Sequence, residues 1–286
     1  MIFSVSHYNK IEDISEEIDN FLHQHPVMNF EAIGILEQLR ENAKAFDGEL
    51  ECLVVMETEQ IQVVTCRIKP YNLLLSHSRN MNSISPLIEY FQEARITIPG
   101  IYGSAAEVKH FAKLWEAITG EEFKISDEFL QYSMIKKKES TKLLGEISIA
   151  KSENKELLKG WTEKSIKEII PGTTEEFINS CTDSFLKLLE EDRVFILEVE
   201  NTPVSMAAIS GQTKTMIAIN DVYTPTEYRG KGYATELCVF LCDYILEDCK
   251  RIPILWVKAS NYVAIHIYEK IGFEKVAEMI LSLKEN

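Results

Sequence analysis

The chain has 286 residues, 45% of them hydrophobic and 26% charged, a composition that supports packed cores and is unlike that of disordered proteins. Its formal net charge of −15 opposes binding to a phosphate backbone, which argues against a nucleic-acid partner and favours a cationic small molecule. No apolar run approaches the ~18 residues of a membrane span, and the six cysteines form no C-x-x-C pair, so the sequence predicts a cytoplasmic protein with no membrane segment and no metal site.

The first part of the chain combines helical spacing of apolar residues with strand-like runs. Gly120 is a natural helix stop, and the charged run 136–140 is a candidate linker, so we predict domains at 1–138 and 139–286. The expected elements are helices at 11–21 and 30–46, strands at 51–56, 60–68 and 72–76, a helix at 85–94, a strand at 96–102, a helix at 105–119 and a strand at 129–136.

The second part follows a similar plan. Pro171-Gly172 separates two predicted helices, and Thr173 or Thr174 is placed to cap the second of them. The expected elements are a strand at 143–150, helices at 155–169 and 174–191, strands at 194–199, 204–210 and 216–223, a helix at 233–249, a strand at 254–258, a helix at 261–271 and a strand at 273–283.

The order of these elements is the same in both parts, which predicts two copies of one mixed α/β unit. The residues match only sparsely between the parts, so the order is the better argument. The alternative is that any mixed α/β chain repeats such elements by chance.

The segment Val222–Thr235 carries the most specific pattern in the chain. It lies between a predicted strand and an amphipathic helix, and Pro225 ends the strand by removing a backbone donor. Gly230 and Gly232 allow a sharp turn and close approach to a ligand, and the following helix presents unpaired N–H groups. Together with the flanking cations Arg229 and Lys231, this arrangement predicts a pyrophosphate site.

At these residues the chain resembles the GNAT superfamily of N-acetyltransferases. The run Arg229-Gly230-Lys231-Gly232-Tyr233-Ala234 fits the family signature [Q/R]-x-x-G-x-[G/A] at its fixed positions. The resemblance implies that the backbone of this loop, through Thr235, holds the pyrophosphate of acetyl-CoA, and that Val222 and Tyr223 bond its pantetheine arm. It also implies two GNAT-like units, each a mixed, mostly antiparallel sheet flanked by helices.

A second matching stretch begins at Asn261, is followed by Tyr268, and ends in Gly272-Phe273. Asn261 and Tyr268 are two helical turns apart and so share a face. The resemblance implies that Asn261 contacts the cofactor arm and that Tyr268 is the general acid that protonates the departing thiolate. Read without the family, Tyr268 is a core aromatic in the apolar stripe of its helix.

The N-terminal part has Ser76–Asn82 where the C-terminal part has its Arg/Gly loop. A second copy would therefore have lost the pyrophosphate cradle. In this respect the chain resembles two-part acetyltransferases in which only the C-terminal copy binds the cofactor.

The family's mechanism implies direct attack of an acceptor amine on the thioester, which requires a base. The candidates are the carboxylates Glu198, Glu200 and Asp221 on or beside predicted central strands. Glu198 interrupts an apolar run, and Asp221 lies two residues before the strand end. Each is also readily explained as a solvated or salt-bridged acid.

The sequence therefore predicts an acetyl-CoA-dependent N-acetyltransferase acting on a small cationic amine, as a monomer or homodimer. Protein N-acetylation stays open, since polyamines, amino acids, aminoglycosides and protein N-termini are all possible acceptors. A non-catalytic acyl-CoA sensor is another alternative. A third is that the N-terminal half serves partner binding or dimerisation, with catalysis incidental.

Overall fold

The computed structural model describes residues 2–136 and 144–284, and the predicted boundary between residues 138 and 139 lies outside them. The chain forms two compact units, and neither is continuous in sequence. Unit 1 comprises Met1–Tyr132, Trp256–Asn261 and Lys275–Asn286, and unit 2 comprises Ser133–Leu255 and Tyr262–Glu274. The C-terminal strand of the chain therefore belongs to unit 1.

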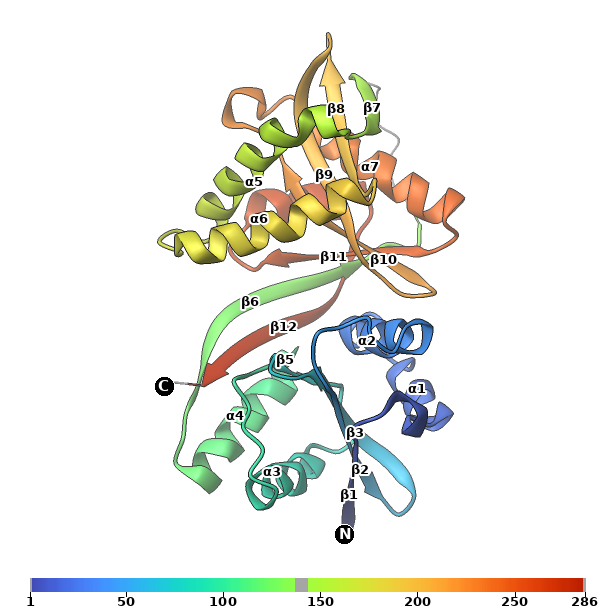
Figure 1. Cartoon of the computed structure of the whole chain (residues 1–286), viewed down its shortest axis with the longest axis vertical. Helices are drawn as coiled ribbons and strands as arrows, with labels where there is room; N and C mark the ends of the chain where they lie inside the picture. The colour runs from blue at the N-terminus through green and yellow to red at the C-terminus, as the bar shows by residue number, and fades with distance from the viewer. Residues whose placement is uncertain (1, 137–143, 285–286) are drawn as a thin grey trace. The chain divides into compact units, whose positions relative to one another are not determined.

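Unit 1 contains a mixed, mostly antiparallel sheet (Figure 1). Its strand order is β1-β2-β3-β4-β5-β12-β6, and only the β4–β5 pair is shown to be parallel. The strands are β1 (Phe3–Tyr8), β2 (Leu50–Glu57), β3 (Gln60–Ile68), β4 (Leu73–Leu75), β5 (Gly100–Ser104), β6 (Phe123–Ser133) and β12 (Glu274–Lys284). The helices are α1 (Glu16–Leu22), α2 (Phe30–Glu41), α3 (Ile84–Glu93) and α4 (Ala105–Thr119).

Alternation along β2 explains why helices cover both faces of this sheet. Cys52 and Val54 pack with α1 and α2, whereas Leu53 and Val55 pack with α3 and α4. Local signals set the boundaries of these elements. The β2–β3 turn has positive φ at both of its central residues, and α4 ends at Gly120 in the left-handed conformation at φ 76°.

Unit 2 repeats the plan with the strand order β11-β10-β9-β8-β7, in which β10 and β11 are parallel. Its strands are β7 (Glu146–Ile149), β8 (Val194–Val199), β9 (Thr202–Gln212), β10 (Met216–Tyr223) and β11 (Ile252–Lys258), whose last three residues belong to unit 1. Its helices are α5 (Lys155–Ile169), α6 (Glu175–Glu190), α7 (Tyr233–Asp243), which continues into a π-helical segment at Tyr244–Asp248, and α8 (Tyr262–Ile271).

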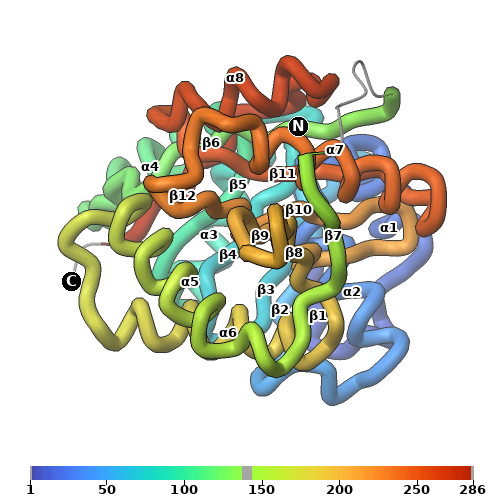
Figure 2. Tube along the Cα trace, turned by 90° about the horizontal axis from the view of Figure 1, so that it is seen from above, coloured from blue at the N-terminus to red at the C-terminus, as the bar shows by residue number. Residues whose placement is uncertain are grey.

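Helices α5 and α6 lie side by side against one face of this sheet (Figures 1 and 2). Trp161 of α5 and Phe185 of α6 pack with Ile196, Met206 and Tyr223 of the strands. The other face meets α7, where Phe195 contacts Phe240 with 6.1 Å between ring centroids. The Thr174 hydroxyl caps α6 by accepting a hydrogen bond from the Phe177 N–H at 3.2 Å, as the sequence predicts.

The repeated order of elements predicted from the sequence is present. Each half of the chain runs strand, two helices, three strands, helix, strand, helix, strand. The observed sheet is mixed and mostly antiparallel, with helices on its faces, as expected. The differences lie at element ends and in β1. Phe3–Tyr8 alternates apolar and polar residues as a strand does, but the first element predicted from the sequence begins only at residue 11.

Candidate functional site

Strand β10 is irregular where the candidate site begins. Its pairing with β9 shifts register between Asn220 and Tyr223, and Asp221 adopts a positive φ of 52°. In the described ladders, the parallel pairing with β11 covers Met216–Ala218 only. The rest of β10 therefore has backbone groups on that side that this ladder does not use, which suits hydrogen bonding to an extended ligand.

The loop after β10 brings two glycines to the start of α7. Gly230 has φ 77°, and Gly232, the N-cap of α7, has φ 90°. Both values lie in the left-handed region that favours glycine. A Cβ at Gly230 would meet no atom within 4 Å, so the space above this backbone is open. The first-turn amides of α7 lack intrahelical acceptors, an arrangement that suits the binding of an anion.

Arg229 ties this loop to the rest of unit 2. Its guanidinium donates to the Thr224 carbonyl at 2.8 Å and to the Glu168 carboxylate at 2.6 Å, and it lies 5.6 Å from the centroid of the Tyr223 ring. Glu168 raises the pKa of Arg229 and also accepts a hydrogen bond from the Tyr223 hydroxyl at 3.2 Å. Two of the guanidinium nitrogens thus donate to groups within unit 2 and hold the loop in place.

Sequence reasoning missed Glu168. It lies on α5, 61 residues from Arg229, and nothing in the local pattern distinguishes it from the other acids of that helix. Lys231 is the more available cation of the loop, because it is exposed and its Nζ lies 5.7 Å from the centroid of the Tyr228 ring. The first-turn residues Tyr233, Ala234 and Thr235 are half-buried.

Glu236 is a second acid that the sequence did not single out. Its side chain is buried and accepts a hydrogen bond from the Leu144 N–H at 2.8 Å, while its other oxygen has no partner among the described residues. The Leu144 side chain lies 3.4 Å from the position of a Cβ at Gly232. Glu236 therefore anchors a segment that borders the glycine loop.

The three candidate bases have different surroundings. Burial raises the pKa of Asp221, at the bulge of β10, to about 6, and its charge helps raise the pKa of Cys181 on α6. The Asp221 side chain nevertheless keeps solvent access. Glu198 is half-buried, opposite Glu146 of β7, and Glu200 is exposed in the β8–β9 turn. A pKa raised toward neutrality suits Asp221 to proton transfer near neutral pH.

Tyr268 is buried in α8, and its ring lies 5.9 Å from that of Phe273. Burial raises its pKa far above the usual range, and the neighbouring thiols Cys238 and Cys242 of α7 add to the effect. The hydroxyl therefore holds its proton at neutral pH. Asn261 directly precedes α8, is exposed, and donates its backbone N–H to the Lys258 carbonyl at 2.9 Å.

Among the described residues, no group of three or more His, Cys, Asp or Glu side chains is arranged to hold a metal ion. Within the same residues, no helix is long and apolar enough to cross a membrane.

Comparison with known proteins identifies the family. The model of the acetyltransferase (GNAT) family matches residues 152–273. An uncharacterised N-acetyltransferase of Methanocaldococcus jannaschii is 34% identical over 92 residues, and this match covers 30% of the chain and 41% of the relative. The chain thus matches less than half the length of this relative.

Two solved structures match nearly the whole chain. A GNAT-family acetyltransferase from Colwellia psychrerythraea has a TM-score of 0.57 at 12% identity, covering 99% of this chain and all of its own. A tandem GNAT protein from the clavulanic acid biosynthesis pathway has a TM-score of 0.52 at 11% identity, covering 98% of both chains.

The family match thus identifies a GNAT-family domain at residues 152–273, in the second half of the chain. The whole chain shares its fold with the tandem GNAT protein.

Proposed function

We propose that this protein transfers an acetyl group from acetyl-CoA to a primary amine of a small, cationic acceptor. The observation that carries the proposal is the loop after β10, where Gly230 and Gly232 adopt left-handed backbone at the start of α7. The loop amides from Arg229 to Thr235 would hold the pyrophosphate, and Val222 and Tyr223 would bond the pantetheine arm. Asn261 would contact the same arm.

The reaction is a direct attack within a ternary complex. The acceptor must first lose a proton, and Asp221 is the base best suited to take it, with Glu198 as the other candidate. The amine nitrogen then bonds to the thioester carbonyl carbon, the C–S bond breaks, and the thiolate takes the proton of the Tyr268 hydroxyl. The second proton lost by the amine nitrogen restores the Tyr268 hydroxyl, and the base releases its proton to solvent. No covalent acyl-enzyme is needed, since the protein acts by holding two substrates and moving two protons.

The proposed domain arrangement gives these roles to residues 139–286, with residues 1–138 as a degenerate copy. The net charge of −15 supports a cationic acceptor, because such a field concentrates positively charged molecules around the protein.

Calorimetric titration of the full chain with acetyl-CoA tests the proposal. We expect saturable binding at one site per chain, followed by release of free thiol when amines are screened. Binding without turnover on any amine would favour an acyl-CoA sensor. Absence of binding by the folded protein would overturn the proposal.

A further inference from the structure

Unit 1 contains a cavity of its own, of about 600 Å³, which lies within the range of small-molecule sites. Helix α2, strands β3, β4 and β5, the segment after β3 and strand β12 contribute its lining. Its walls are mainly apolar or aromatic, formed by Ile35, Phe46, Ile68, Tyr71, Leu74 and Leu281. The other four lining residues carry polar or ionisable groups: Glu31, Arg67, Asn72 and Tyr102.

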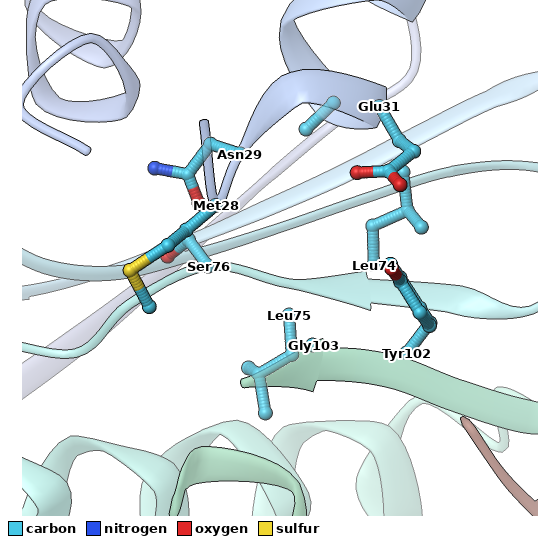
Figure 3. A pocket seen from close by; sticks show the side chains of 9 residues that line it. Met28, Asn29, Glu31, Leu74, Leu75, Ser76, Tyr102 and Gly103 are labelled. Carbon is cyan, nitrogen blue, oxygen red and sulfur yellow. The ribbon is translucent and has the colours of Figure 1, made fainter. Parts of the chain in front are cut away.

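Glu31 is the group that gives this cavity a chemical preference. Figure 3 shows its carboxylate pointing from α2 toward Tyr102 on β5, in a small pocket that adjoins the cavity and shares Glu31, Leu74 and Tyr102 with it. Burial raises the pKa of Glu31 to about 7, and an interaction with the Tyr102 hydroxyl opposes part of that rise. Among the described residues, no basic side chain forms an ion pair with Glu31.

The positive charge of Arg67 is not paired with the Glu31 carboxylate, because the Arg67 guanidinium donates its hydrogen bonds to other groups. Its guanidinium donates to Glu51 at 2.7 Å, to the Thr97 carbonyl at 2.9 Å and to the Tyr71 carbonyl at 3.5 Å. Glu51 is fully buried and also pairs with Lys69 at 3.1 Å. Arg67 is thus paired with Glu51, whereas no basic side chain of the described residues pairs with the carboxylate of Glu31.

We infer that unit 1 binds a small organic cation in this cavity, with an ammonium group on Glu31 and an apolar body against the surrounding side chains. A carboxylate at the edge of an apolar cavity with no cationic partner among the described residues is costly, and a hydrogen-bonded ammonium reduces that cost. Tyr102 fixes the carboxylate from one side, so the ligand approaches from the cavity. This site is separate from the acetyl-transfer site proposed in unit 2 and does not depend on it.

The test uses the full chain at pH 8 without acetyl-CoA. Calorimetric titration compares three probes of equal chain length: n-hexylammonium, 1-hexanol and hexanoate. We expect saturable binding of n-hexylammonium at one site, with at least tenfold weaker binding of the other two. Equal or tighter binding of hexanoate, or no saturation with n-hexylammonium, would overturn the inference.

Two variants locate the site. Glu31→Gln keeps the shape and removes the charge, so n-hexylammonium should bind at least tenfold more weakly. Glu41→Gln is the matched control, because Glu41 is exposed at the end of the same helix and does not line the cavity. Wild-type affinity in Glu31→Gln would refute the assignment.

A third variant separates this inference from the function proposed for unit 2. Gly232→Glu, in the glycine loop, should bind n-hexylammonium as the wild type does even though acetyl-CoA binding is lost. If n-hexylammonium binding also disappears in that variant, the amine binds in unit 2 and the inference fails.

Discussion

The loops that follow β4 in unit 1 and β10 in unit 2 occupy equivalent places in the order of elements. They differ in whether their backbone amides are hydrogen-bonded within the protein. In unit 2 the loop has two left-handed glycines with open space above Gly230. In unit 1 the Ser78 N–H donates to the Glu107 carboxylate at 3.1 Å, and the same carboxylate pairs with His77 at 2.9 Å. In unit 1 a carboxylate of the protein itself thus accepts the hydrogen bond of a loop amide.

The strands beside these loops differ in the same sense. All three residues of β4 pair with β5, and the two strands approach so closely that a Cβ at Gly103 would meet the Leu75 carbonyl at 2.5 Å. In unit 2 the parallel ladder covers only the first three residues of β10. The same fold therefore has an open loop in one unit and a closed loop in the other, and only the open loop leaves backbone groups available to a ligand.

The variant with the largest expected effect on the difference between the two loops is Gly232→Glu. It places a side chain and a negative charge where the pyrophosphate would lie, at a strained φ of 90°. We expect acetyl-CoA affinity to fall by at least about 100-fold, measured by calorimetry. Gly120→Glu is the matched control, with φ 76° and no atom within 4 Å of its Cβ, but in unit 1 at a helix C-terminus. Equal affinity in both variants would refute the loop assignment.

Tyr268→Phe tests the chemistry assigned to unit 2. Removal of the hydroxyl should leave acetyl-CoA affinity nearly unchanged and lower kcat by about 100- to 10,000-fold, which is the range for loss of a general acid. Thiol release in steady-state assays and calorimetric affinity are measured on the same sample. A fully active variant would remove Tyr268 from the mechanism.

Asp221 gives unit 2 a predicted pH dependence. Its pKa is raised to about 6, and a base works only when deprotonated, so kcat/KM should rise about tenfold per pH unit below 6 and level off above it. Asp221→Asn should lower activity and lose this limb. If the limb persists in the variant, another group is the base, and Glu198→Gln is then the next variant to examine.

Glu107→Gln tests the role of the carboxylate that bonds the unit 1 loop. Loss of the charge weakens the bonds to His77 and Ser78, and we expect the free energy of unfolding to fall by about 1–2 kcal/mol. Acetyl-CoA affinity should not change, because this loop is not the proposed cradle. A shift in melting temperature is the first measurement, and an altered number of acetyl-CoA sites would contradict the prediction.

Sequence analysis succeeded where a residue acts through its own neighbours. Gly120 ends α4, Thr174 caps α6, and the glycines before Tyr233 begin α7, because each effect spans a few residues. The roles proposed for Asp221, Glu198 and Tyr268 stay predictions. The contact of Glu168 with Arg229 and that of Glu31 with Tyr102 were out of reach, since each joins residues that only the folded chain brings together.

Which segments of the chain belong to which unit also could not be predicted from local sequence patterns. Pairing of Met279–Leu283 with β5 is what brings the end of the chain into unit 1, and that register depends on residues about 180 positions apart. Nothing within β12 itself indicates which strands it pairs with.

This discontinuity has a consequence for how the protein is made. A ribosome delivers residues 1–132 early, but unit 1 still lacks Trp256–Asn261 and Lys275 onward at that stage. The Ser104 end of β5 is left without Met279, its partner on β12, until synthesis has passed that residue. Unit 1 therefore cannot complete its sheet until all the segments of unit 2 have been translated.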